Sequence, residues 1–176
     1  MIPIVDKSVL LITPPKCGST TLHDHLCCKL GYPWMIGPSK YGGVVKYDKH
    51  SAEIPEEWPH LKPVILVRNP LTRISSLYSH HVSWCSWKGI EHFSKDQFID
   101  SVAAGNDLFY QAITKRYSRY VGYWKIENIE SELNDIGIAG VVGVSNKSKK
   151  KFAFSDKQLG RIDSWIDSDS KEFGYD

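Results

Sequence analysis

The residues best suited to chemistry lie between the first apolar run and a helical segment. The chain there runs Thr13-Pro14-Pro15-Lys16-Cys17-Gly18-Ser19-Thr20-Thr21-Leu22. The two prolines end the preceding strand, and the pattern predicts a helix over residues 18–30. The N–H groups of a helix N-terminus attract anions, and Lys16 adds a full positive charge. The segment therefore predicts an anion-binding loop, in which the hydroxyls of Ser19, Thr20 and Thr21 donate to phosphate oxygens.

This loop departs from the pattern of nucleoside-triphosphate sites, which is G-x-x-x-x-G-K-[ST]. Here Lys16 precedes Gly18, and no glycine opens the loop. An ordinary strand-to-helix turn capped by Ser19 or Thr20 is the alternative interpretation of the segment taken alone.

A second cationic position follows another apolar run. Val64-Ile65-Leu66-Val67 leads into Arg68-Asn69-Pro70, and Ser76 comes eight residues after Arg68. Ligands of parallel α/β sheets gather at the carboxyl ends of the strands. We therefore expect Arg68 and the Lys16 loop on one sheet edge, as two sites for a ligand with two separated anionic groups.

The elements that must position these residues alternate between strand and helix. Apolar, β-branched runs predict strands over 8–13, 44–47, 63–68, 121–126 and 138–144. Helical patterns cover 18–30, 71–84, 127–136 and 155–165, with Ser155 as an N-cap, and one or two more helices are expected within 84–120. The alternation predicts an α/β fold: one domain over residues 1–176, with a central, mostly parallel sheet flanked by helices.

Composition excludes several classes of protein. The 176 residues carry a formal net charge of +2, which argues against a nucleic-acid or membrane-surface binder. No apolar run approaches the ~18 residues of a membrane helix. The first residues lack the basic and apolar segments of a secretory signal, so we expect a cytoplasmic protein. Oligomeric state stays open.

The four cysteines show no C-x-x-C spacing, which gives no support for a zinc or thioredoxin-like site. Cys27 and Cys28 are interpreted as small core residues, with a disulfide as the less favoured alternative. No metal site is expected.

Two motifs together resemble the sulfotransferases that use 3′-phosphoadenosine 5′-phosphosulfate (PAPS). The segment from Pro15 to Thr21 is similar to their 5′-phosphosulfate loop, and Arg68-Asn69-Pro70…Arg73…Ser76…Tyr78 to their 3′-phosphate motif. The tail, with Val142-Gly143-Val144-Ser145-Asn146-Lys147-Ser148-Lys149 and then Phe173-Gly174-Tyr175, resembles the carbohydrate branch. A lesser similarity is Ile126-Glu127-Asn128-Ile129.

The resemblance implies a P-loop-like nucleotide-binding core. It also implies a donor, PAPS, a product, adenosine 3′,5′-bisphosphate (PAP), and an acceptor, a hydroxyl or amine of a small molecule or glycan. Arg68 and Ser76 would hold the 3′-phosphate, and a lysine of the run 147–151, Lys147 or Lys149 among them, would close over it. Lys16 would stabilise charge on the departing phosphate oxygen. The 5′-phosphosulfate would lie on the loop residues Lys16, Cys17, Gly18, Ser19, Thr20 and Thr21.

The acceptor needs a general base, and the resemblance points to His50, which lies 18 residues before Arg68. An imidazole with a pKa near ~6.5 suits this role. Glu53 is the first substitute, and the alternative for His50 is a solvent-exposed loop histidine. A nucleophilic role for Cys17 is disfavoured, because sulfuryl transfer needs no protein nucleophile.

The acceptor side matches nothing residue by residue. Six aromatic residues from this region either line an acceptor pocket or form the core, and average burial tendencies favour the core. They are Trp84, Trp87, Phe109, Tyr110, Tyr117 and Tyr120. Two other functions remain as alternatives. One is a P-loop nucleotide kinase, which would need an acidic metal-binding residue at a strand end; the other is a non-catalytic protein that binds PAPS or PAP.

Overall fold

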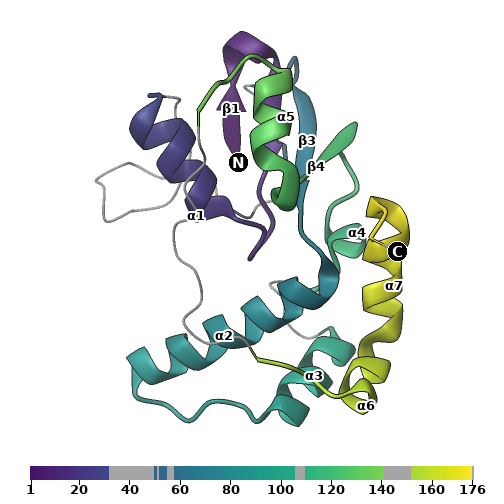
Figure 1. The fold of residues 1–176 in the computed structure, drawn as a ribbon. Coiled ribbons are helices and arrows are strands. Elements are labelled where there is room, and N and C mark those ends of the chain that lie inside the picture. Colours follow the sequence, from purple (N-terminus) through teal and green to yellow (C-terminus); the bar gives the residue numbers. More distant parts are fainter. Residues whose placement is uncertain (32–49, 51, 55–57, 106–109, 141–151, 176) are drawn as a thin grey trace. The chain divides into compact units, whose positions relative to one another are not determined.

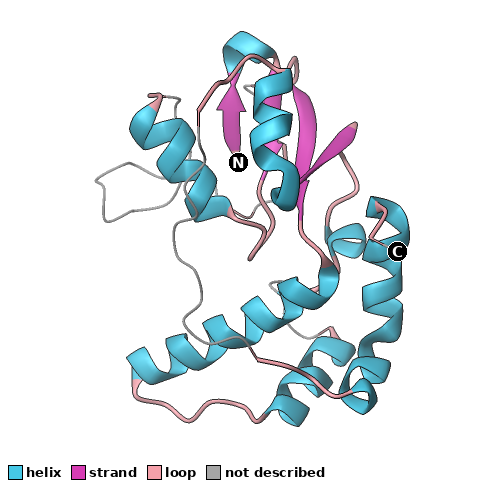
Figure 2. Ribbon diagram, viewed as in Figure 1, coloured by secondary structure: helices cyan, strands magenta, loops and turns pink. Residues whose placement is uncertain are grey.

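Four strands form one mixed sheet in the computed structural model, which describes residues 1–31, 50, 52–54, 58–105, 110–140 and 152–175 (Figure 1). The chain divides into two units, Met1–Arg68 with Tyr117–Asn146, and Asn69–Arg116 with Lys147–Asp176. The sheet belongs to the first unit. In the second unit, every regular element among the described residues is a helix (Figure 2).

The sheet order follows the chain: β1 (Ile2–Ile4), β2 (Val9–Ile12), β3 (Lys62–Val67) and β4 (Gly122–Lys125). β1 and β2 pair antiparallel, whereas β2 with β3 and β3 with β4 pair parallel. Residues of β2 are all buried, which explains its uninterrupted apolar run. The expected α/β class with parallel central strands is confirmed, and the antiparallel β1 is an element that the sequence analysis did not anticipate.

The helices of the first unit follow the parallel strands. After β2 the chain enters α1 (Ser19–Leu22), which continues without a break as the π-helix η2 (His23–Lys29). After β4 come a short 3₁₀ turn, η4 (Ile126–Asn128), and α5 (Ile129–Asp135), which packs beside β4. A helix over 18–30 is thus confirmed, although its second part has π geometry, which proteins often use near functional sites.

The longest helix, α2 (Pro70–Lys88), opens the second unit. Asn69 caps it, because the Asn69 side chain accepts the N–H of Thr72 at 3.2 Å, and Pro70 takes the first helical position. At the other end, Gly89 adopts the left-handed conformation. The helix begins as predicted and extends beyond the predicted end at residue 84.

The remaining helices of the second unit are α3 (Lys95–Ala104), α4 (Ile113–Arg116), α6 (Asp156–Leu159), the 3₁₀ turn η5 (Gly160–Ile162) and α7 (Asp163–Phe173). Capping boxes start two of them, with Ser94 and Gln97 at α3 and Ser155 and Gln158 at α6. The predicted cap at Ser155 is confirmed, and α7 carries the C-terminal helix past the predicted end at residue 165.

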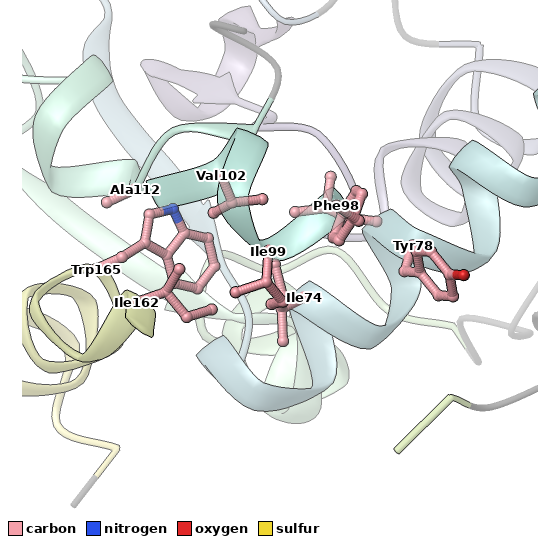
Figure 3. Packing of buried hydrophobic residues seen from close by; sticks show 9 residues of the cluster. Ile74, Tyr78, Phe98, Ile99, Val102, Ala112, Ile162 and Trp165 are labelled. Carbon is pink, nitrogen blue, oxygen red and sulfur yellow. The ribbon is translucent and has the colours of Figure 1, made fainter. Parts of the chain in front are cut away.

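One apolar cluster joins these helices into a core (Figure 3). Ile74 and Tyr78 of α2 contribute to it, together with Phe98 and Ile99 of α3. Trp165 of α7 lies at its edge, and the indole N–H of Trp165 donates to the Tyr110 carbonyl at 2.9 Å. The rings of Tyr78 and Phe98 lie 5.0 Å apart. This core fixes α2 against α3 and α7.

A buried ion pair lies beside this core. Arg73 and Asp169 are each 1% exposed, and Arg73 Nη1 lies 3.6 Å from Asp169 Oδ2. The Asp169 carboxylate also accepts the N–H groups of Ile113 and Thr114, so it holds the start of α4. Arg73 stacks over the Trp165 ring at 5.1 Å. Arg73 is part of the sequence motif around Arg68, and here it serves packing within the second unit.

Two of the predicted strands lie wholly or partly outside the described residues. The strand predicted over 44–47 lies outside the described residues; of the strand predicted over 138–144, residues 138–140 are described and are not strand. Nothing described tests whether residues 1–176 are one domain. None of the helices in the described ranges is both long and apolar enough to cross a membrane.

Candidate functional site: the loop after the second strand

The predicted anion-binding loop leaves the sheet at the carboxyl end of β2 and leads into α1 (Figure 1). Thr13, Pro14 and Pro15 are buried, and the Cys17 N–H donates to the Pro14 carbonyl at 3.3 Å, which closes a tight turn. Lys16 sits at the tip with φ 63°, an unusual conformation for a residue with a side chain. Strained backbone of this kind concentrates at functional sites.

Gly18 provides the transition from the turn to the helix. Its φ is 87°, and it is the N-cap residue of α1, so it offers no side chain to the first helical N–H groups. A Cβ at this position would lie 2.6 Å from Cδ1 and 2.8 Å from Cγ1 of Ile126, which follows β4. The loop therefore needs glycine both for its backbone angle and for the close approach of Ile126.

The hydroxyl residues of the loop open the helix. Ser19, Thr20 and Thr21 are the first three residues of α1; Ser19 and Thr20 are half-buried and Thr21 is buried. The alternative of a turn capped by Ser19 or Thr20 is wrong, because Gly18 is the N-cap and no side-chain hydrogen bond caps α1. A helix start that lacks a side-chain cap suits an anionic ligand.

The two cationic motifs meet within the first unit. Arg68 directly follows β3, and its Nη1 donates to the Lys16 carbonyl at 3.2 Å, across 52 residues of sequence. The parallel pairing of Ile12 with Ile65 explains this contact, because it brings the ends of β2 and β3 to the same edge. The expectation that Arg68 and the Lys16 loop share an edge is confirmed.

His50 lies beside Thr13, the first residue of the same loop. Its Nδ1 is 2.7 Å from the Thr13 carbonyl oxygen, and the residue is 7% exposed, so a solvent-exposed histidine is the wrong interpretation. A carbonyl oxygen only accepts, so Nδ1 carries the proton, and in the neutral ring Nε2 carries the lone pair. The hydroxyl of Tyr117 donates to the His50 carbonyl at 2.8 Å. Glu53, the substitute base, is exposed.

Cys17 is fully buried, and its thiol donates to the Pro15 carbonyl, with Sγ 3.8 Å from the oxygen. This environment suits a small packing residue in a tight loop. Cys17, Cys27 and Cys85 are free thiols. Among the described residues no group of three or more His, Cys, Asp or Glu side chains could hold a metal ion.

Three of the residues expected to contact PAPS, which are Ser76, Lys147 and Lys149, stay predictions. Ser76 is buried on α2 in the second unit. Lys147 and Lys149 lie outside the described residues.

The aromatic residues of the expected acceptor region differ in how deeply they are buried. Tyr117 is 2% exposed, as the core interpretation predicts. Trp84 and Trp87 on α2 are 45% and 76% exposed, so the core interpretation is wrong for them. Tyr110 and Tyr120 are partly buried, and Phe109 lies outside the described residues.

Two residues at the site were missed as site residues by sequence reasoning. Ile126 appeared only within a minor resemblance, and Tyr117 only as one aromatic residue among six. Ile126 could have been found from its place at the end of the strand predicted over 121–126, because ligand-site residues gather at the ends of parallel strands. No local pattern marks Tyr117, because its hydrogen bond joins residues 67 positions apart.

In the described part of the first unit, pKa values are shifted at His25 and at Glu132. Burial lowers the pKa of His25 on η2, and Lys29 nearby lowers it further, whereas Glu130 opposes the shift. Burial raises the pKa of Glu132 on α5, and Asp135 adds to this effect. Both nitrogens of the His25 ring are buried without a hydrogen-bond partner among the described residues.

Comparison of the chain with protein-family models, with curated proteins and with solved structures gave no match. Function is therefore argued from the residues and their geometry.

Proposed function

We propose that this chain is a sulfotransferase that moves a sulfuryl group from PAPS to a hydroxyl or amine of a small molecule or glycan. The observation that carries the proposal is the hydrogen bond from Arg68 to the Lys16 carbonyl. It joins the two resembling motifs at one sheet edge, where a donor with two separated anionic groups needs two cations.

The residues present fit such a donor. The left-handed backbone at Lys16 and Gly18, and a helix start without a side-chain cap, form a backbone environment for an anion. The 5′-phosphosulfate would lie against Lys16 and the hydroxyls of Ser19, Thr20 and Thr21. Arg68 would bind the 3′-phosphate, with Ser76 and a lysine of the run 147–151, such as Lys147 or Lys149, as further predicted contacts.

The donor supplies the sulfuryl group and a bisphosphate leaving group. Lys16 stabilises the negative charge that builds on the oxygen bridging sulfur and phosphorus as the S–O bond breaks. Removal of one such stabilising group typically costs about 10²- to 10³-fold in rate.

His50 is the proposed general base. With its Nδ1 proton held by the Thr13 carbonyl, the proton of the acceptor hydroxyl passes to Nε2 as the new O–S bond forms. Glu53, the substitute base, is exposed, whereas His50 is buried beside the loop.

A nucleotide kinase fits the strand ends less well. β3 ends at Val67 before Arg68, and β4 ends in Lys125, where a kinase would need a carboxylate to hold its metal ion. A non-catalytic protein that binds PAP is the other alternative, and only a transfer assay separates it from an enzyme.

Binding of PAP and AMP, measured by calorimetry, tests the donor site. Because a charge-assisted hydrogen bond is worth about 1.5–3 kcal/mol, the 3′-phosphate is expected to strengthen binding about 10- to 150-fold. In Arg68→Ala this preference should disappear. If Arg68 only supports the loop, Arg68→Ala weakens both ligands equally, and its assigned contact with the 3′-phosphate is wrong.

Transfer of radiolabelled sulfate from PAPS to a panel of hydroxyl and amine acceptors tests the reaction. Lys16→Ala should lose at least about 100-fold in rate, whereas Lys29→Ala, which removes the same charge from an exposed position on η2, should keep full activity. Full activity in Lys16→Ala would refute the mechanism. Magnesium-dependent turnover of ATP with no preference for PAP would identify a kinase instead.

A further inference from the structure

The candidate base His50 belongs to no helix or strand, so contacts from elsewhere in the first unit must hold it. Two are defined. The ring is held through Nδ1 at the Thr13 carbonyl, 2.7 Å away, and the backbone through the His50 carbonyl, which accepts the Tyr117 hydroxyl at 2.8 Å. The first contact sets the tautomer, and the second fixes the peptide from which the ring projects.

We propose that Tyr117 is a positioning residue for His50 in sulfuryl transfer. The inference rests on the proposed function, in which His50 accepts the acceptor's proton. Tyr117 follows α4 and precedes β4, and it is 2% exposed. Its buried ring cannot reorient freely, so the hydroxyl is a fixed donor for a backbone carbonyl that no regular element holds.

The consequence for His50 follows from geometry. Loss of the Tyr117 hydroxyl removes one contact that holds the His50 peptide, and a shift of that peptide moves the ring relative to the Thr13 carbonyl. If the bond from Nδ1 weakens, the neutral ring populates both tautomers, and the form with its lone pair on Nε2 is no longer the main one. Misplacement of a reacting group by ~1 Å can cost up to about 10²-fold in rate.

A purely structural role for Tyr117 makes a different prediction. Core packing alone would lower stability, and with it the amount of folded protein, but it would leave the rate per folded molecule and the His50 tautomer unchanged. The chain offers a control in Trp165, which is 8% exposed, belongs to neither motif, and donates its indole N–H to the Tyr110 carbonyl at 2.9 Å. Trp165→Phe removes a bond from a buried aromatic side chain to a distant backbone carbonyl in the second unit.

The test compares Tyr117→Phe with Trp165→Phe and with the unmodified protein. Thermal melting, kcat and KM for PAPS are measured, together with the ¹⁵N shifts of the His50 ring, assigned with His50→Gln. Tyr117→Phe should lower kcat about 10- to 100-fold and change KM for PAPS by less than about twofold, as expected for loss of an interaction outside donor binding. Its His50 spectrum should change from the Nδ1–H form to a mixture of tautomers, and Trp165→Phe should keep both kcat and spectrum.

Three results would overturn the proposal. They are an unchanged kcat in Tyr117→Phe, an equal loss of kcat in both variants, and an Nε2–H tautomer of His50 in the unmodified protein. The last measurement needs no variant, so it decides even where Tyr117→Phe folds poorly. If the unmodified protein transfers sulfate to no acceptor, the proposed function fails, and an unchanged His50 spectrum in Tyr117→Phe then separately rejects the positioning by Tyr117.

Discussion

Substitution of Gly18 by alanine perturbs the loop at its tightest point. Two costs add there. A residue with a Cβ at φ 87° loses about 1–2 kcal/mol relative to glycine. The new Cβ would also lie 2.6 and 2.8 Å from two atoms of Ile126, and an overpacked contact costs about 1–3 kcal/mol. We therefore expect Gly18→Ala to destabilise the protein by about 2–5 kcal/mol.

Two further variants separate these costs. Gly89 has φ 68°, and a Cβ there would meet nothing within 4 Å, so Gly89→Ala should show the backbone cost alone. Ile126→Ala removes Cγ1 and Cδ1 and leaves Cβ, which lies 3.9 Å from the added methyl group. In the Ile126→Ala background, Gly18→Ala should therefore cost about 1–3 kcal/mol less than it does alone.

Equilibrium unfolding in urea gives the four free energies of this cycle, and calorimetry with PAP shows whether the loop still binds its ligand. PAP binding should weaken in Gly18→Ala and stay unchanged in Gly89→Ala. The reasoning is refuted if Gly18→Ala costs no more than Gly89→Ala and Ile126→Ala recovers nothing. In that case the loop adapts to a Cβ, and Ile126 does not constrain it.

Two other predictions concern stability. Asp169→Ala leaves the buried Arg73 without its carboxylate and should lower the free energy of unfolding in urea by about 3–5 kcal/mol. Asp167→Ala, which breaks an exposed pair on the same helix, should lower it by under about 1 kcal/mol. Equal costs would contradict the assigned role of the buried pair. Because burial lowers the pKa of His25 below 6.5, the unfolded chain binds more protons just below that pH, so stability should fall as pH drops below 6.5. His25→Leu should reduce the loss of melting temperature between pH 7.5 and 5.5, and exposed His60→Leu should not; an undiminished loss in His25→Leu would refute this.

Local patterns were enough to predict most regular elements. The apolar runs before Pro14 and Arg68 are strands because their residues, apart from the half-buried Val64, are buried on both faces of a small sheet. Ser155 begins a helix because its side chain accepts an N–H at the helix start. β1 escaped prediction because its three residues, Ile2–Ile4, include a proline and, among the described strands, pair with β2 alone. A strand this short has no periodicity of its own.

The site could be predicted in its residue types and only partly in its contacts. Lys16 and Arg68 were expected on one edge because parallel strands align their carboxyl ends, and a hydrogen bond joins them there. Exposure of Trp84 and Trp87 contradicted average burial tendencies, which say nothing about a particular helix face. The contact between Tyr117 and His50 depends on the folded path of the chain, which no local pattern encodes.

In the first unit, the backbone carbonyls of Thr13, Lys16 and His50 accept hydrogen bonds from side chains that are distant in sequence. The donors are the side chains of His50, Arg68 and Tyr117, respectively. In each bond a side chain holds irregular backbone, which α-helical or strand hydrogen bonds cannot hold. At least one of the two residues in each bond has a proposed role in the chemistry. The loop and its candidate base are thus fixed by side chains before a ligand arrives, which lowers the ordering cost of binding. Substitution of Arg68 or His50 consequently removes both a chemical group and a support of the backbone, and only comparisons between matched ligands or matched variants separate the two effects.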